Sequence, residues 1–245
     1  MDDIKKAVDM ILSSKKTFIL TGAGISTESG IPDFRSNTGY YSKMDPALAL
    51  SKDVLINNPE RFYKEGYVIL EDIFDKEPNV GHKIIKKLED LGLVQGIITQ
   101  NIDNLHTKAG STNVYEVHGQ TRTVHCMKCH KEYSFSLMKE LVNNNEIPPK
   151  CPECNSVLRP DVVMFGDMMP IDFLKAENEL KNTELLLVIG SSLTVSPVNY
   201  LPDMVSKLII INNTPTPVDR RAQVVFHQSS GKVLKEILNE IERRN

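Results

Sequence analysis

The segment FILTGAGISTESGIPDFRS, residues 18–36, decides the fold class, because a short apolar run ends directly in a glycine-rich turn. A strand followed by a turn such as GAG, at 22–24, is typical of α/β sheets that bind nucleotide phosphates at a helix N-terminus. The usual fingerprint places a third glycine three residues later. Here it follows six residues later, at Gly30, and the segment PDFR at 32–35 comes next. We therefore expect a nucleotide site with an additional loop beside it.

Length and composition are those of an ordinary globular protein. The chain has 245 residues, which predicts one or two domains. A net charge of −3 gives no electrostatic reason to expect nucleic acid or an anionic membrane as a direct partner. The first 16 residues are too charged for a signal peptide, and no run approaches the roughly 18 apolar residues of a membrane span. We expect a cytoplasmic protein.

The cysteines predict a structural zinc site. They form two C-x-x-C pairs separated by 21 residues: Cys126, Cys129, Cys151 and Cys154. Four thiolates complete a tetrahedral zinc shell, so the metal should hold structure and not activate water. A disulfide framework fits poorly with a cytosolic chain, and a redox motif needs only one pair. His125 and His130 flank the first pair and could replace a ligand, but we interpret them as surface residues.

Apolar runs alternate with helical patterns along the chain. Runs without clean alternation, as in strands covered on both faces, occur at 17–21, 96–99, 185–189 and 208–211. Amphipathic helical patterns occur at 2–14, 81–92, 172–182 and 231–245. This order predicts a Rossmann-like, doubly wound parallel sheet.

Two segments interrupt this order and predict a small second domain. We expect residues 1–35, 81–120 and 158–245 to form the nucleotide-binding domain. A helical insertion, 36–80, and the cysteine module, 121–157, would form the small domain.

Small or polar residues follow the other predicted strands. Gly190 is followed by Ser191 and Ser192, and the run LIII is followed by Asn212 and Asn213. Because ligands bind at the carboxyl ends of parallel strands, these residues and the GAG turn form a candidate nucleotide site. An asparagine replaces the acidic residue that usually meets the ribose, which, with the displaced third glycine, disfavours an ordinary dehydrogenase.

His118 is the candidate base. The strand at 96–99 is followed by polar side chains at 100–106, and His118 stands near the end of the strand-like segment 114–119, just before the cysteine module. A histidine can act near neutral pH as a general base on a hydroxyl. The histidines interpreted as satisfied core or surface groups are His82, His106 and His227.

The order of eight motifs resembles that of the sirtuin family of protein deacylases, in its bacterial type. They are GAGIS, GIPDFR, TQNIDNLH, the HG before the first cysteine pair, the two pairs together, RPDVVMFGD, GSSL and the late asparagine. The resemblance implies an acetyl-preferring enzyme that consumes NAD to deacetylate lysine side chains. Its products would be nicotinamide, free lysine and O-acetyl-ADP-ribose.

The resemblance also implies roles for individual residues. His118 would be the general base toward the ribose hydroxyls, and Asn101, with Gln100, would order the ribose and a water. Phe34 would shield the ribose, and Arg35 would contact phosphate. The nicotinamide pocket would consist of Phe34, Ile102 and Asp103. The full NAD-binding set would be Gly22, Ala23, Gly24, Thr27, Phe34, Arg35, Gln100, Ile102, Asp103, Ser191, Ser192, Asn212 and Asn213.

The partner implied by the resemblance is a protein or peptide that carries acetyl-lysine, inserted as a strand between 163–166 and 195–198. The expected peptide contacts are Val163, Phe165, Gly166 and Val195. Asp167 stands where many relatives carry glutamate. The oligomeric state is not readable from the sequence, and we expect a monomer.

One sequence feature of the helical insertion indicates which acyl groups the protein prefers. Relatives that favour succinyl groups carry a Tyr-x-x-Arg pair, whereas here Tyr63 is followed by Gly66, and the nearest cation is Lys64. Without a guanidinium to offset its desolvation, an acidic acyl group should be disfavoured.

Two alternatives to deacylation stay open at this point. ADP-ribosyl transfer to protein could follow from the same cleaved intermediate. A non-catalytic NAD-sensing or zinc-ribbon module is the other, although such a module would need no base at His118.

Overall fold

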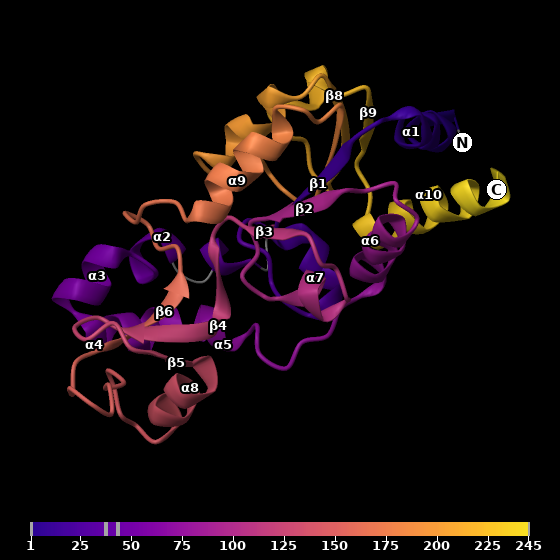
Figure 1. Cartoon of the computed structure of the whole chain (residues 1–245). Helices are drawn as coiled ribbons and strands as arrows, with labels where there is room; N and C mark the ends of the chain where they lie inside the picture. Colours follow the sequence, from indigo (N-terminus) through magenta and orange to yellow (C-terminus); the bar gives the residue numbers. More distant parts are fainter. Residues whose placement is uncertain (1, 37–38, 43–44, 245) are drawn as a thin grey trace.

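Six parallel strands form the centre of the larger lobe in the computed structural model, which describes residues 2–36, 39–42 and 45–244 (Figure 1). Their order is β3-β2-β1-β7-β8-β9, and every neighbouring pair is parallel. The strands are β1 Thr17–Thr21, β2 Gly96–Thr99, β3 Val114–Glu116, β7 Leu185–Ile189, β8 Lys207–Ile211 and β9 Val224–Phe226. The doubly wound, Rossmann-like sheet expected from the sequence is confirmed.

Helices cover both faces of this sheet. Ile19 and Ile97 face a layer of three helices, α1 Asp2–Ser13, α6 Val80–Asp90 and α10 Ser230–Arg244. The adjacent positions, Leu20 and Ile98, face the opposite layer, α9 Ile171–Leu180 and the 3₁₀ helix η4 Val198–Met204. All four side chains are fully buried. Each contributes about 1.5–3 kcal/mol, so burial on both faces explains why the strands are continuously apolar.

The helices begin and end close to the positions that the sequence predicts. The helices expected at 2–14, 81–92 and 172–182 are α1, α6 and α9, with ends shifted by one or two residues. The helix expected at 231–245 is α10, and its last expected residue, 245, lies outside the described residues. None of the helices in the described part of the chain has the length and apolar character that crossing a bilayer requires.

A three-stranded antiparallel sheet forms the base of the smaller lobe (Figure 1). Its order is β5-β4-β6, with β4 Gly119–Cys126, β5 Glu132–Ser134 and β6 Leu158–Val162, and α8 Phe135–Asn143 lies between β5 and β6 in the chain. The sequence interpretation ended this module at residue 157. Strand β6 instead pairs with β4 and not with the six-stranded sheet, so residues 158–162 lie in the smaller lobe.

Short helical segments of the 36–80 region complete the smaller lobe. They are η2 Tyr40–Ser42, α2 Pro46–Ala49, α3 Lys52–Asn57, α4 Pro59–Arg61, the π-helical turn η3 Phe62–Gly66 and α5 Tyr67–Glu71. Residues 37–38 and 43–44 of the expected insertion lie outside the described residues. Phe62, Tyr63 and Tyr67 share one buried cluster with Val124 of β4 and Leu158 of β6, so the helical segments and the three-stranded sheet share a core.

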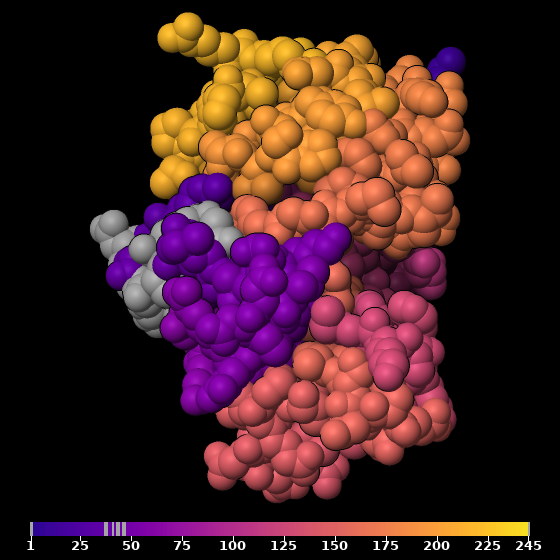
Figure 2. All heavy atoms as spheres, turned by 90° about the vertical axis from the view of Figure 1, so that its left-hand side faces the viewer, coloured from indigo at the N-terminus to yellow at the C-terminus, as the bar shows by residue number. Residues whose placement is uncertain are grey.

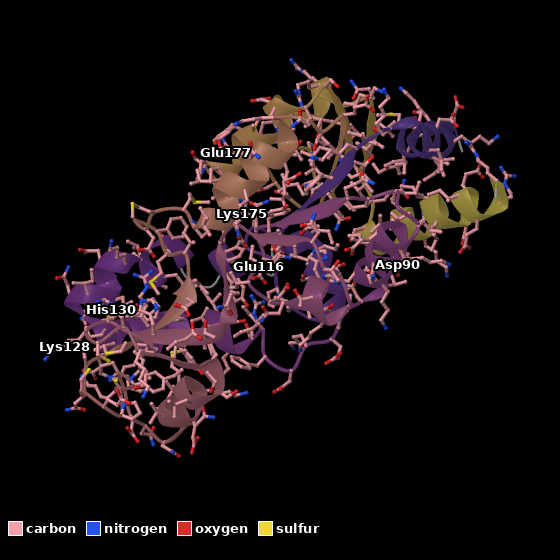
Figure 3. The ribbon with its side chains drawn as sticks, in the orientation of Figure 1. Asp90, Glu116, Lys128, His130, Lys175 and Glu177 are labelled. Carbon is pink, nitrogen blue, oxygen red and sulfur yellow. The ribbon has the colours of Figure 1, made fainter. Side chains whose placement is uncertain are left out.

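The two lobes are joined by a charged contact beside the six-stranded sheet. Glu116, at the end of β3, accepts hydrogen bonds from both terminal nitrogens of Arg122 on β4, one of them at 2.7 Å (Figure 3). Figure 2 shows the surface hollowed between the lobes, where the chain around residues 100–120, coloured magenta, lies deep. The carboxyl ends of β1, β2 and β7 are therefore placed next to the junction of the lobes.

Candidate functional site

The glycine-rich turn after β1 is in backbone contact with the end of β7. The Gly24 N–H donates to the Gly190 carbonyl at 2.8 Å, and the Gly22 N–H donates to the Ile189 carbonyl at 3.1 Å. A Cβ on Gly24 would lie 2.7 Å from the Gly190 Cα, and one on Gly22 would lie 2.8 Å from its carbonyl oxygen. Neither position has room for a side chain, so the turn stays open toward a ligand.

The displaced third glycine ends a short helix. Residues Ala23–Ser29 form the 3₁₀ helix η1, and Gly30 caps it in the left-handed conformation at φ 81°. Its N–H bonds back to the Thr27 carbonyl at 3.0 Å. Glycine adopts this conformation without strain. The chain can therefore turn away after two helical turns and form the loop 31–36 beside the site.

Asn101 and Asp103 are held by Ser26. The Asn101 side-chain amide donates to the Gly22 carbonyl and to the Ser26 hydroxyl, both at 3.1 Å, and Ser26 donates to Asp103 Oδ2 at 2.6 Å. The Leu105 N–H, at the start of α7 Leu105–Lys108, donates to Asp103 Oδ1 at 2.9 Å. Burial raises the pKa of Asp103, while these donors favour its carboxylate form. The strand end after β2 is thus fixed against the turn after β1.

His118 is held by the same strand end. Its Nδ1 lies 3.0 Å from the Gln100 carbonyl oxygen, and the Gln100 side-chain amide donates to Ser191 Oγ at 2.7 Å. Because a carbonyl oxygen only accepts, Nδ1 carries the proton and Nε2 is the free base. Burial lowers the pKa of His118, and the hydrogen bond to Gln100 offsets part of that shift. The half-buried imidazole is therefore neutral at pH 7.

The loop after Gly30 lies beside the end of β7. The Arg35 guanidinium donates to Ser192 Oγ at 3.2 Å, although the arginine itself is exposed. The rings of Phe34 and Tyr40 lie 5.4 Å apart, and Tyr40 donates to Asp72 at 3.0 Å. The loop is thereby connected to both lobes.

The remaining expected nucleotide contacts are more exposed. Thr27 donates to the Gly24 carbonyl at 2.9 Å, and Asn213 is exposed. Asn212 follows β8, and its side-chain amide donates to the Thr214 carbonyl at 2.7 Å. His227 follows β9, and its Nδ1 lies 3.2 Å from the Asn212 carbonyl.

The 163–166 segment is already partly paired. The Val163 N–H donates to the His118 carbonyl at 2.8 Å. Phe165 pairs with the start of α3, donating to the Leu50 carbonyl at 3.2 Å and accepting from the Lys52 N–H at 3.0 Å. Among the described residues, no partner is found for the Val163 carbonyl or the Gly166 N–H. On the other segment, the half-buried Val195 accepts from the Asn199 N–H at 3.0 Å.

The four cysteines form a metal site in the smaller lobe. Their Sγ atoms all lie within 4.8 Å of one another, with Cys126 and Cys154 at 3.3 Å and Cys129 and Cys151 at 3.7 Å. A zinc tetrahedron with bonds of about 2.3 Å has sulfurs about 3.8 Å apart, whereas a disulfide requires about 2.05 Å. The distances and the four soft donors fit one zinc ion and no disulfide.

The surroundings of Cys126 and Cys151 also favour thiolates. The N–H groups of Lys128 and Cys129 each lie 3.4 Å from Cys126 Sγ, and the Tyr133 hydroxyl lies 3.2 Å from Cys151 Sγ. His125 contacts Asp161 and His130 is exposed, so neither joins the cluster (Figure 3).

Two buried histidines lie beneath the nucleotide edge. His82, on α6, and His106, on α7, have ring centroids 4.9 Å apart. His106 Nε2 lies 3.0 Å from the Thr21 hydroxyl, which donates to Thr99 Oγ1 at 2.8 Å. Their core location agrees with the sequence interpretation, but their satisfaction does not: within the described residues, both His82 nitrogens and His106 Nδ1 lack a partner. Burial lowers the pKa of His82 to about 4 and that of His106 well below its usual range.

Comparison with known proteins gives the family. The Sir2 family matches residues 22–197. The chain belongs to the Sir2 family. The "NAD-dependent protein deacetylase 2" of Caldanaerobacter subterraneus subsp. tengcongensis is 54% identical over 239 residues, which cover 97% of this chain and 96% of that protein. An "NAD-dependent protein deacetylase" of Oceanobacillus iheyensis is 43% identical, covering 95% and 98%.

Solved Sir2 structures share the whole fold. A Sir2 complex with a deacetylated p53 peptide and 3′-O-acetyl ADP ribose matches with a TM-score of 0.92 at 35% identity, covering 97% of this chain and 98% of that one. A Sir2 complex with a p53 peptide and NAD⁺ matches with a TM-score of 0.87 at 36% identity, covering 97% and 98%. The resemblance read from the motifs is confirmed.

Three further side chains contact the candidate site residues and are not singled out by the sequence. Ser26 contacts both Asn101 and Asp103 and is 1% exposed. Thr21 and Thr99 connect the site to the buried histidines. A serine after two glycines and a threonine at each strand end were the available signals. They carry little weight alone, because such residues are common in turns.

Proposed function

We propose that this Sir2 chain is an NAD-dependent protein lysine deacetylase with His118 as its general base. NAD, when bound, supplies the ADP-ribosyl group that accepts the acetyl group, and one water is consumed, so nicotinamide, free lysine and O-acetyl-ADP-ribose are released. The observation that carries the proposal is the pair of fixed strand ends: Ser26 is hydrogen-bonded to Asn101 and Asp103, and His118 is hydrogen-bonded to the Gln100 carbonyl beside them. Relatives named as NAD-dependent deacetylases over nearly their whole length support it.

The glycine turn and the end of β7 would hold the phosphates. The groups there are small hydroxyls and backbone atoms, with the turn Gly22–Gly24 on one side and Ser191 and Ser192 on the other. Arg35 contacts Ser192 and would place its guanidinium against a phosphate. Asn212 and Asn213 follow the next strand, where an adenosine ribose would lie.

The nicotinamide end would be recognised by Asp103, Ile102 and Phe34. Each Asp103 oxygen accepts one hydrogen bond from the protein, and each has a further lone pair for a carboxamide N–H. Ile102 packs in the apolar cluster with Ile31. Asn101, fixed by Ser26, would order the ribose and a water beside it.

His118 would take the proton from a ribose hydroxyl. Its Nδ1 proton is held by the Gln100 carbonyl, so Nε2 is in the basic form and its direction is set. Because burial lowers the pKa of the ring, the base is unprotonated at neutral pH.

The acetyl-lysine peptide would add as a strand beside 163–166 and 195–198. No described residue forms a hydrogen bond with the Val163 carbonyl or the Gly166 N–H of the first segment, and these groups would pair with the peptide backbone or the acetyl-lysine N–H. Phe165 and Val195 would contact the peptide through their side chains.

Neutral acyl groups would be preferred at this site. The Tyr63 hydroxyl donates to the Leu158 carbonyl at 2.6 Å, so it is already bound. Gly66 is packed against Ala49, whose carbonyl oxygen would lie 2.4 Å from a Cβ at 66. Lys64 is exposed and paired with Glu60 at 2.5 Å. None of these groups offers a free cation to an acidic acyl chain.

Zinc would hold the smaller lobe together. With four thiolate ligands its shell is closed, so it would supply folding free energy and not an activated water.

Free thiols of this kind persist in reducing compartments, which supports a cytoplasmic location. We also infer that the insertion and the cysteine module form one small domain beside the NAD-binding domain. The monomer expected from the sequence stays a prediction.

Mass spectrometry of an acetyl-lysine peptide with and without NAD tests the proposal. We expect loss of the acetyl group only with NAD, and an equal amount of O-acetyl-ADP-ribose. NAD consumed beside an unchanged peptide, with ADP-ribose attached to protein, would replace deacetylation by ADP-ribosyl transfer. If neither changes, the chain is a binding module.

A further inference from the structure

The segment that would receive the peptide ends in a tight turn. The Asp167 N–H donates to the Met164 carbonyl at 3.0 Å, and Gly166 between them has φ 93°. A positive φ at this third position is typical of a type II turn, which favours glycine. The turn sets the directions of the Val163 carbonyl and the Gly166 N–H, two groups for which no partner is found among the described residues.

The Asp167 carboxylate closes this turn and ties it to β6. Its Oδ2 accepts from the Met164 N–H at 3.0 Å and also from the Arg159 guanidinium. The side chains of Arg159 and Asp167 are only 17% and 10% exposed. Lys52 lies 3.8 Å from the other carboxylate oxygen. A charged pair this far out of water holds its geometry more firmly than a surface pair does.

The same turn is connected to the candidate base. Val163, at the start of the segment, donates to the His118 carbonyl at 2.8 Å. On the other edge, Phe165 is paired with the start of α3. If the turn were displaced, the Val163 carbonyl and the Gly166 N–H would therefore change position relative to both lobes.

We propose that Arg159 and Asp167 form a positioning pair that sets the affinity for the acetyl-lysine peptide by fixing the Met164–Asp167 turn. This rests on the proposed function. Neither side chain touches a reacting atom. The pair acts through the Val163 carbonyl and the Gly166 N–H, so it affects the KM for the peptide more than the KM for NAD or kcat.

Two substitutions of Asp167 distinguish the hydrogen bond that its carboxylate accepts from the charge that it places opposite Arg159. Asp167→Asn retains an oxygen for the Met164 N–H but removes the charge opposite Arg159. Asp167→Glu retains the charge. The longer glutamate side chain can also approach the buried Nε of Arg159, which has no partner among the described residues. If the ion pair fixes the turn, glutamate substitutes for aspartate and asparagine does not.

Steady-state kinetics with an acetyl-lysine peptide and NAD, each varied in turn, test the inference. We expect Asp167→Asn to raise the KM for the peptide about tenfold, as expected when a charge-assisted hydrogen bond is lost, with kcat and the KM for NAD within about twofold. Asp167→Glu should stay within about threefold for the peptide. Asp90→Asn is the matched control, because Asp90 is exposed and forms an ion pair with Lys86 on α6 (Figure 3); it should change nothing.

A second variant guards against misfolding. Arg159→Gln should raise the same KM, and the double variant with Asp167→Asn should be no worse than the poorer single variant, because both remove one interaction. An unchanged peptide KM in both single variants, or equal rises for peptide and NAD, overturns the positioning role. Absence of deacetylation by the unaltered protein instead overturns the proposed function, so the two failures are distinct.

Discussion

The zinc site and the nucleotide edge of the sheet gather their residues in opposite ways. The four cysteines come from one segment, 126–154, and their sulfurs meet across two tight turns. The nucleotide edge collects Gly22, Asn101, His118 and Ser191 from distant segments, which meet because the strands are parallel and in register. The local site needs its metal to form, whereas the distributed site is formed by the sheet. Losing a ligand should therefore damage structure in the first and only chemistry in the second.

The largest expected effect is at the zinc site. Cys151→Ser should lose the metal and unfold the three-stranded sheet, because a structural zinc contributes about 10 kcal/mol or more to small zinc modules. Activity falls indirectly, since β6 leads into the 163–167 segment. Metal analysis and thermal unfolding measure this, with Glu153→Gln in the same loop as the control. Full zinc content and an unchanged melting temperature in Cys151→Ser would show that the cysteines do not hold the metal.

His118→Ala should affect chemistry alone. We expect kcat to fall by about 10²–10⁴, the contribution of a general base, while zinc content and melting temperature are retained. His130→Asn removes an exposed histidine from the zinc turn and is the control, since asparagine tolerates its φ of 59°. A His118→Ala variant as active as the unaltered protein would remove His118 from the mechanism.

The pH dependence of kcat/KM tests the assignment of His118 as the general base. The base works unprotonated, and burial lowers the pKa of His118 below its usual 6.5. The rate should therefore fall only as the pH drops through that lowered pKa, which places the acidic limb below about pH 6.5. A limb centred above pH 7 would indicate a different group.

The buried histidines predict acid sensitivity in the larger lobe, away from the four cysteines. His82 has a pKa of about 4 when folded and about 6.5 when unfolded, so the unfolded chain binds more protons between these values. The free energy of unfolding is thus complete above pH 6.5 and falls by about 3 kcal/mol as the pH drops toward 4. Measured by denaturant unfolding, the unfolding free energy of His82→Leu should not show this part of the decrease, whereas that of His130→Asn should show it. Equal pH dependence in His82→Leu and the unaltered protein would contradict the assignment.

The smallest effect concerns the shared core of the smaller lobe. Tyr63→Phe leaves the Leu158 carbonyl without its donor and should cost about 1–2 kcal/mol of unfolding free energy. Tyr200→Phe removes an exposed hydroxyl that contacts Glu177 on α9, and it should cost less than about 0.5 kcal/mol (Figure 3). Equal costs for the two variants would mean that the Leu158 carbonyl finds water instead.

The contrast between the two sites also explains what the sequence predicts. Cysteine spacing is a local signal, and strand ends with glycine or serine follow one general rule, so the metal site and the nucleotide edge were both visible. The pairing of β6 with β4 was not, because an apolar run does not name its partner strand. Nor were the contacts of Ser26 and the closeness of His82 to His106, which depend on how helices and turns from separate segments pack.

The backbone contact between Gly24 and Gly190 limits natural variation at the sheet edge. A Cβ at Gly190 would lie 2.3 Å from the Ile25 nitrogen, closer still than the contacts that forbid side chains at 22 and 24. A random-substitution library sorted for folded protein should therefore retain glycine alone at these three positions and accept many residues at Thr27. Glycine at these three positions, which are far apart in the chain, would then be required by a single distance, the one between β1 and β7.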